Sequence, residues 1–159
     1  MTEIATLAGG CFWGVEELIR KLPGVIDTAV GYTGGTLANP TYEYVKKGST
    51  GHAETVEIQF DPAKISYDEL LDFFFRVHDP TTKNRQMNDA GTQYRSTIFV
   101  HNEAQREAAR RAIERNQPRW PKPIATEIAD ATTFWPAEDY HQDYLQRLPW
   151  GYNCHYLRE

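Results

Sequence analysis

A cysteine lies in a setting where its thiol could act as a nucleophile, within the run Gly9-Gly10-Cys11-Phe12-Trp13-Gly14. An apolar run at 4–8 precedes it, and apolar residues at 15, 18, 19 and 22 follow with helical spacing. This pattern predicts a strand, a glycine-rich turn and a helix, with Cys11 at the first helical turn. Unpaired N–H groups and the helix dipole favour a thiolate there. The alternative is that Cys11 is a small buried apolar side chain, and position alone does not decide.

Polar side chains also gather in two other predicted loops, 42–54 and 89–94. If the three loops meet at one end of a sheet, the thiol shares a pocket with the carboxyl of Glu54 and the phenols of Tyr42 and Tyr94. A carboxyl kept neutral by burial can donate a proton. Phenols can donate hydrogen bonds to an oxygen on which charge develops. The set suits attack by a thiolate on an electrophilic centre that bears a polar oxygen.

Each of these side chains also has a plain structural interpretation. The rings of Phe12 and Trp13 could form an apolar wall for a substrate, or could simply pack in the core. Glu54 at the head of a strand could be a solvated charge. His52 could cap a turn, and the two tyrosines could be ordinary core or surface aromatics. Residue types and spacing therefore indicate a candidate cysteine enzyme and no more.

The elements that would position these loops alternate along the chain. Residues 25–32 and 55–60 read as strands, and Ser66-Tyr67-Asp68-Glu69 is a capping box that starts a helix. A strand at 94–100, a helix from Asn102, a strand at 124–128 and a last helix from about 137 follow. We expect a two-layer α/β sandwich with a mixed sheet, folded as a ferredoxin-like split βαβ plait.

The length and composition indicate one ordinary domain over 1–159. The end of the chain, from about 147 to 159, is expected to be a mobile coil. The net charge is −5 and no block of lysine or arginine occurs, which argues against nucleic-acid and membrane partners. No apolar run is long enough to span a bilayer. We expect a cytoplasmic monomer. The two cysteines, Cys11 and Cys154, fit a transient bridge better than a structural one, and their spacing predicts no metal site.

Taken together, the motifs resemble the peptide methionine sulfoxide reductase A family. The matching stretches occur in the family's order over nearly the whole chain: Gly10-Cys11-Phe12-Trp13-Gly14, Asn39-Pro40-Thr41-Tyr42, Gly51-His52-Ala53-Glu54, Asn88-Asp89, Gly91-Thr92-Gln93-Tyr94-Arg95-Ser96, Phe134-Trp135 and Ala137-Glu138-Asp139-Tyr140-His141-Gln142. The resemblance implies reduction of the S epimer of methionine sulfoxide, free or in proteins. It implies no metal and no bound organic cofactor.

The resemblance also implies roles for single residues. Cys11 matches the nucleophile and Glu54 the proton donor. Tyr42 and Tyr94 match the phenols that bind the sulfoxide oxygen, and the ring pair at 12–13 matches the wall for the S-methyl group. The reaction would leave a sulfenic acid on Cys11, which a second thiol converts to a disulfide and thioredoxin then reduces.

The resemblance also points to four further residues, whose roles it specifies less closely. Asp89 matches a polar site residue, and His52 and His141 are assigned to supporting hydrogen bonds. Cys154 is the candidate resolving thiol, although Asn153 separates it from the Gly-Tyr pair that directly precedes this cysteine in many relatives. The alternative is that Cys154 is a spectator and an external thiol resolves the sulfenic acid.

There are two alternative classes of function: another cysteine enzyme, such as a thiol hydrolase or a peroxidase, and a silent binding module. A thiol hydrolase would need a histidine base beside Cys11, and a peroxidase would not need a methyl-sized aromatic wall. A catalytically silent sulfoxide- or peptide-binding module would bind its ligand without the thiol and never turn over. Thiol consumption with methionine sulfoxide, compared with an acyl ester or a peroxide, distinguishes these functions.

Overall fold

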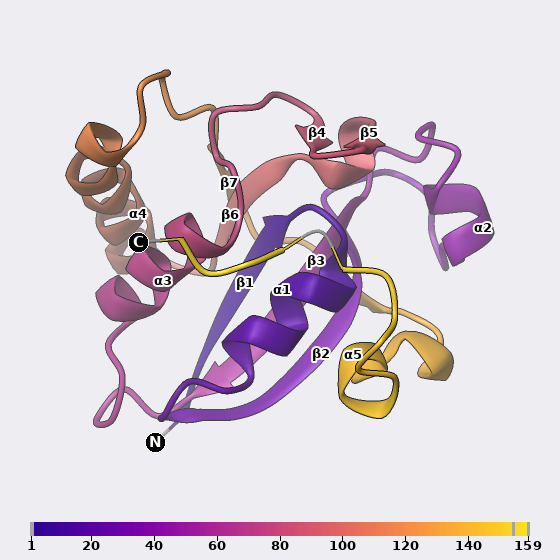
Figure 1. Ribbon diagram of the computed structural model, residues 1–159, viewed down its shortest axis with the longest axis horizontal. Helices are drawn as coiled ribbons and strands as arrows, with labels where there is room; N and C mark the ends of the chain where they lie inside the picture. The colour runs from indigo at the N-terminus through magenta and orange to yellow at the C-terminus, as the bar shows by residue number, and fades with distance from the viewer. Residues whose placement is uncertain (1, 154, 159) are drawn as a thin grey trace.

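The structure, a computed structural model, describes residues 2–153 and 155–158, so Cys154 lies outside the described residues. Its centre is one mixed sheet with the strand order β7-β6-β1-β3-β2-β8 (Figure 1). The strands of this sheet are β1 (Glu3–Gly9), β2 (Val25–Thr33), β3 (Ala53–Phe60), β6 (Ser96–Val100), β7 (Glu127–Asp130) and β8 (Trp135–Pro136). A separate small ladder pairs β4 (Arg85–Gln86) with β5 (Asp89–Ala90).

The two inner strands, β1 and β3, are antiparallel to each other. β2 pairs antiparallel with β3, and β6 pairs antiparallel with β1. Only β7 and its neighbour β6 run parallel, and a helix joins them as a parallel pair requires. The prediction of a mixed α/β domain is confirmed.

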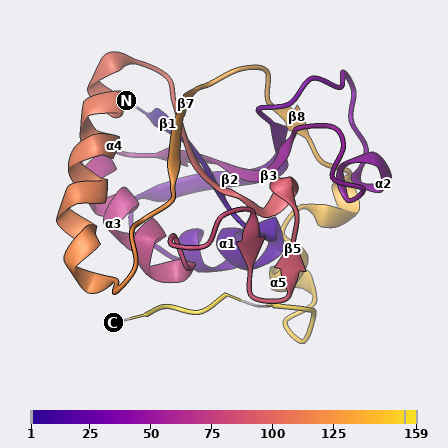
Figure 2. The same ribbon diagram turned by 90° about the horizontal axis from the view of Figure 1, so that it is seen from above.

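Helices cover the sheet unevenly. The helices are α1 (Phe12–Ile19), α2 (Tyr42–Val45), α3 (Tyr67–Val77), α4 (Glu103–Asn116) and α5 (Tyr144–Arg147). Figures 1 and 2 both place α1 and α3 on the same face of the sheet, with α4 beside β6 and β7. No helix in the described residues is both long and apolar enough to cross a membrane.

Apolar side chains from the sheet and the helices form the core between them. In β3 the alternating residues Val56, Ile58 and Phe60 are buried while Gln59 is exposed, as the sequence pattern predicts. The capping box at the start of α3 is also present. Ser66 Oγ accepts the N–H of Glu69 at 3.0 Å, and the Glu69 carboxylate accepts the N–H of Ser66 at 3.1 Å.

The last predicted helix is wrong as a single element. A 3₁₀ turn at Asp139–His141 and the short α5 replace it, and Asp143 between them has a left-handed φ of 53°. Contacts with a distant strand and a distant helix cause the break. The side chain of Gln142 binds both the N–H and the C=O of Val30, and the N–H of Asp143 donates to the buried carboxyl of Glu16.

Two predicted strands begin later than expected. Tyr94 belongs to a 3₁₀ turn, Thr92–Tyr94, and the strand starts at Ser96. The strand predicted at 124–128 is found at Glu127–Asp130. The polar stretch that precedes Tyr94 contains the β4–β5 ladder, which is too short for strand periodicity to reveal.

Hydrogen bonds hold the described part of the C-terminal coil against the domain. The Nε2–H of buried His155 donates to the C=O of Gly9 at 2.7 Å. The N–H of Arg158 donates to the C=O of Arg76, and Arg76 Nε donates to the C=O of Arg158, both at 2.7 Å. The mobility of this coil stays a prediction.

Gly14 provides the space for the coil. A Cβ at this position in α1 would lie 2.5 Å from Asn153 Oδ1 and from His155 Nδ1. Real Cβ atoms essentially never approach other atoms so closely. Gly14 of the cysteine motif therefore allows the coil to pack on the first turn of α1.

We predict that Gly14→Ala displaces the coil while the sheet stays folded. The clash with Asn153 and His155 outweighs the gain of about 1 kcal/mol that alanine brings to a helix over glycine. Hydrogen exchange of the His155 amide and limited proteolysis of residues 150–158 measure the displacement. A variant that is about 1 kcal/mol more stable than the wild type, with the coil still protected, contradicts this reading.

Candidate active site

Cys11 occupies the N-cap position of α1, where the backbone leaves β1 and turns into the helix. Its φ and ψ are −52° and 121°, and only 8% of the residue is exposed. Gly10 makes the turn with φ +98°, and a Cβ there would lie 2.5 Å from Gln86 Cγ. The predicted position of the cysteine, just before the first helical turn, is confirmed. The unpaired N–H groups of that turn favour negative charge nearby.

Glu54 lies at the head of β3 and is 1% exposed. Its Oε1 accepts the N–H of Phe12, the residue directly after Cys11, at 3.2 Å. Its Oε2 has no hydrogen-bond partner among the described residues. The carboxyl is thus tied to the cysteine turn by one oxygen, while the other stays available to an incoming group.

Burial raises the pKa of Glu54 to about 8. The Phe12 N–H opposes this shift by stabilising the carboxylate, and the negative charge of Asp89 adds to the shift. The carboxyl therefore holds its proton at neutral pH. A neutral acid beside a cysteine is the arrangement that general acid catalysis requires.

The two predicted phenols belong to the same neighbourhood. Tyr42 begins α2 and Tyr94 ends its 3₁₀ turn. Burial raises the pKa of Tyr42 to about 12 and raises that of Tyr94 as well. The charges of Glu54, Cys11 and Asp89 contribute to both shifts, so these five groups act on one another. Both phenols keep their O–H and can donate hydrogen bonds at neutral pH.

An aromatic cluster forms the side of the site next to Cys11. Phe12 is buried, and the ring of Trp13 stacks on that of Tyr144 with centroids 4.0 Å apart and planes at 15°. The rings of Trp13 and Tyr42 are also stacked, with centroids 6.5 Å apart. This cluster gives the site an apolar surface that can contact a methyl group.

His141 holds this cluster in place. It is buried, and its Nδ1 accepts the indole N–H of Trp13 at 2.9 Å, so the proton of the neutral ring is on Nε2. Burial lowers the pKa of His141, which favours this neutral form. The supporting hydrogen bond expected of His141 is therefore present.

His52 has a structural role in a loop. Its Nδ1 accepts the N–H of Gly35 at 3.1 Å, and its Nε2–H donates to the C=O of Leu37 at 2.7 Å. The residue fixes the glycine loop that follows β2 against the start of β3. These two hydrogen bonds support the loop next to Glu54.

Asp89 lies in β5 and connects the site with the C-terminal coil. The hydroxyl of Tyr152 donates to Asp89 Oδ1 at 3.3 Å. Its charge also raises the pKa values of Glu54, Tyr42 and Tyr94. Asp89 therefore acts electrostatically on these three groups.

Sequence reasoning missed the residue that positions Tyr42. Glu138 Oε2 accepts the N–H of Tyr42 at 3.0 Å, and its Oε1 accepts the hydroxyl of buried Tyr32 at 2.8 Å. Burial of Glu138 opposes ionisation, but these hydrogen bonds outweigh it and lower its pKa, so the group is a carboxylate. The sequence signal that could have identified Glu138 is its place in the run 137–142, one of the stretches that match the family and the one that contains His141.

The fold and the site together place a cysteine at the N-terminus of a helix beside a buried carboxyl that keeps its proton. Residues 3–159 match the family model described as peptide methionine sulfoxide reductase. The peptide methionine sulfoxide reductase MsrA of Leifsonia xyli subsp. xyli is 52% identical, and the match covers 99% of this chain and 92% of that protein.

Solved structures agree with these matches. The reduced form of Mxr1 from Saccharomyces cerevisiae superposes with a TM-score of 0.95 at 43% identity, over 99% of this chain and 93% of that one. Mxr1 in complex with Trx2 superposes with a TM-score of 0.68 at 33% identity, over 99% and 91%. The chain belongs to the peptide methionine sulfoxide reductase family, and its activity is the reduction of methionine sulfoxide.

We predict that Glu54→Gln stabilises the fold increasingly as the pH rises. The folded-state pKa of about 8 lies above the unfolded value of 4.5. Between these values the folded state keeps a proton that the unfolded state has lost, so the free energy of unfolding falls with rising pH. The glutamine variant has no such titrating group, so its free energy of unfolding does not fall in this way. For the wild type this fall cannot exceed about 1.4 kcal/mol per pH unit. Denaturant unfolding across this pH range measures the difference, and a difference that does not change with pH contradicts the raised pKa.

We predict that His141→Phe lowers kcat/KM for methionine sulfoxide about ten-fold. The phenylalanine keeps the ring packing but leaves the Trp13 N–H without an acceptor, which costs about 1–3 kcal/mol. His141→Asn retains an acceptor, so it should recover part of the loss. Steady-state kinetics of both variants make the comparison, and equal kcat/KM for wild type and His141→Phe would refute the positioning role.

Proposed function

We propose that the chain reduces the S epimer of methionine sulfoxide, free or in proteins, to methionine and so repairs oxidative damage. Cys11 is the nucleophile and Glu54 the proton donor. One observation carries the proposal: the neutral, buried carboxyl of Glu54 is bonded to the amide directly after Cys11. A thiolate at a helix N-terminus and a proton held next to it are the two components that removal of the sulfoxide oxygen needs.

In the first step, the Cys11 thiolate attacks the sulfoxide sulfur and Glu54 protonates the oxygen. A bond forms between Cys11 Sγ and the substrate sulfur while the S–O bond breaks and the protonated oxygen leaves as hydroxide. The hydroxide then attacks Cys11 Sγ, the S–S bond breaks with its electron pair on the substrate sulfur, methionine leaves as the thioether, and Cys11 becomes a sulfenic acid. The substrate sulfur gains two electrons and the cysteine sulfur loses two. The phenols of Tyr42 and Tyr94 stabilise the oxygen by hydrogen bonds, and their raised pKa values support this donor role.

The epimer preference comes from the asymmetric walls of the site. Phe12 and Trp13 contact the S-methyl group on the apolar side, while the phenols and Glu54 bind the oxygen on the polar side. The stacking of Trp13 on Tyr144 and its bond to His141 support a rigid methyl pocket. In the R epimer the oxygen and another substituent on the sulfur have exchanged places. With the methyl group in its pocket, the oxygen of this epimer would therefore lie away from the phenols and Glu54.

In the second step, Cys154 condenses with the Cys11 sulfenic acid, which forms a disulfide and releases water. Thioredoxin then reduces the disulfide by thiol–disulfide exchange, so the enzyme needs no bound cofactor. The complex of its relative Mxr1 with Trx2 supports this reductant. The contacts of Tyr152 with Asp89 and of His155 with Gly9 support a coil that lies along the site.

Other assignments complete the proposal. The order β6-β1-β3-β2, in which β3 separates β1 from β2 and is antiparallel to both, supports a ferredoxin-like split βαβ plait in two layers. We assign the chain as a cytoplasmic monomer that acts as a single domain, with Asp89, His52 and His141 in supporting roles.

A single-turnover assay tests the proposed function. We expect reduced protein without thioredoxin to release about one methionine per chain from the S epimer and none from the R epimer, because one chain carries one oxidisable nucleophile. Cys11→Ser should release none, with the fold checked by circular dichroism. Methionine from Cys11→Ser at the wild-type level, or equal yields from both epimers, would overturn the proposal.

Cys154→Ser separates the two steps. We predict that this variant still releases one methionine in a single turnover, but that it does not cycle with thioredoxin, because the sulfenic acid has no second thiol to condense with. Measurement of NADPH consumption with thioredoxin and its reductase follows the cycling. Thioredoxin-driven cycling at the wild-type rate would instead make Cys154 a spectator.

A further inference from the structure

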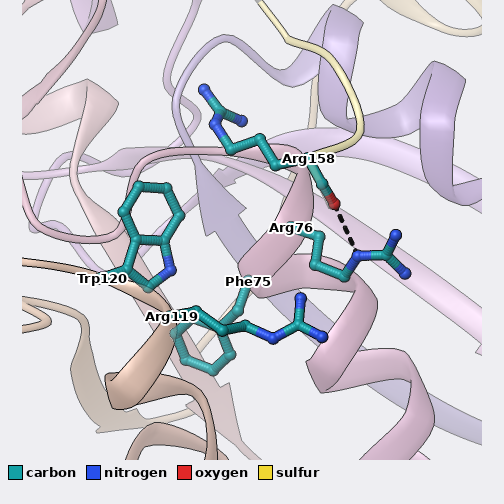
Figure 3. Close-up of a pocket in the computed structure, with 5 residues that line it drawn as sticks. All are labelled: Phe75, Arg76, Arg119, Trp120 and Arg158. Atoms are coloured by element: carbon teal, nitrogen blue, oxygen red, sulfur yellow. Dashed lines mark hydrogen bonds between the residues drawn. The ribbon is translucent and has the colours of Figure 1, made fainter.

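A cavity of about 180 Å³ lies between α3 and the segment that follows α4 (Figure 3). Its lining residues are Phe75, Arg76, Arg119, Trp120 and Arg158. They come from three parts of the chain, namely α3, the end of a 3₁₀ turn after α4, and the C-terminal coil. None of the residues assigned to methionine sulfoxide reduction lines this cavity.

Every polar side chain that lines the cavity is a hydrogen-bond donor. Three are guanidinium groups and the fourth is the indole of Trp120. Among the described residues, Arg76, Arg119 and Arg158 form no ion pair, whereas four other arginines of the chain pair with carboxylates: Arg20, Arg106, Arg110 and Arg115. A group of unneutralised arginines in a protein of net charge −5 is a local positive site.

The arrangement of these donors leaves room for an acceptor between them. Figure 3 shows the guanidinium groups of Arg76 and Arg119 on the same side of the cavity, and the ring nitrogen of Trp120 turned toward them. The guanidinium of Arg158 points away from these two and lies 4.0 Å from the ring centroid of Tyr156 and 5.9 Å from that of Trp120. The Nε1 of Trp120 is buried and has no acceptor among the described residues. A buried donor without a partner calls for a missing acceptor.

We propose that this cavity binds a small oxyanion, a phosphate or a carboxylate. Guanidinium groups match the oxygens of both ions, and the indole N–H supplies a neutral donor. Two hydrogen bonds of 2.7 Å already join Arg76 and Arg158 at the edge of the cavity, one between their backbones and one from Arg76 Nε to the C=O of Arg158. An anion bound beside them adds a bridge between α3, the segment after α4 and the C-terminal coil.

This bridge bears on the reaction cycle, since Arg158 follows Cys154 by four residues in the sequence. The bound anion fastens the coil that carries this cysteine against the domain, and so it slows resolution of the sulfenic acid. This consequence rests on the proposed function. The anion site itself does not, so its test uses no turnover.

Hydrogen exchange of the Arg158 amide tests the site. Its N–H donates to Arg76, so exchange requires the coil to open beside the cavity. Inorganic phosphate and succinate are titrated separately through the millimolar range, with chloride at the same ionic strength as the reference. If opening releases the anion, exchange slows about ten-fold when the anion concentration is ten times Kd. Slowing by phosphate alone identifies a phosphoryl site, and slowing by succinate alone a carboxylate site.

Two charge-matched variants complete the experiment. Arg119→Gln removes one guanidinium that makes no hydrogen bond or ion pair in the described residues, so we expect the fold to survive and the slowing to disappear. Arg111→Gln removes the same charge from the exposed face of α4, outside the cavity, and should keep the slowing. No slowing by either anion relative to chloride, or equal slowing in Arg119→Gln, overturns the proposal.

Discussion

The site depends on a carboxyl that must be buried and yet held in place. Glu54 satisfies both conditions because the amide of Phe12 binds one oxygen while the sheet and the aromatic cluster exclude water. Burial alone would favour the neutral acid without fixing its position, and the amide alone would favour the carboxylate. The balance between them leaves a proton beside Cys11 at neutral pH. The same hydrogen bond joins the head of β3 to the first turn of α1, so Glu54 and Cys11 are positioned together.

The glycines around the cysteine explain how the other elements come so close. Gly10 adopts a positive φ, which allows the turn from β1 into α1, and Gly14 leaves the space that Asn153 and His155 occupy. One short motif therefore places the nucleophile and provides the surface for the C-terminal coil. Glu138 binds the N–H of Tyr42 and His141 binds the indole N–H of Trp13, one hydrogen bond each. Contacts of this kind fix the geometry on which transition-state stabilisation depends.

Local signals in the sequence predicted most of the fold and the place of the nucleophile. The strand–turn–helix around Cys11 and the capping box of α3 depend on neighbours in the chain, and both were confirmed. The last helix was predicted wrongly because Gln142 and Asp143 bond to residues more than a hundred positions away. The burial of Glu54 could not be predicted either, since it results from packing between distant strands. Residue types and loop positions made Glu54 one candidate acid, and the family resemblance assigned it that role.

The protonation state of Glu54 is the central claim, and a carbon-13 NMR titration of its side-chain carboxyl measures it without reference to turnover. Comparison with Glu54→Gln assigns the resonance and separates it from that of Glu16, another buried carboxyl, whose pKa burial raises to about 7. The account predicts that the Glu54 resonance stays that of a neutral acid at pH 7 and titrates with a midpoint near 8. A midpoint near the ordinary value of 4.5 would show a carboxylate at neutral pH, and it would contradict the assignment of Glu54 as the proton donor.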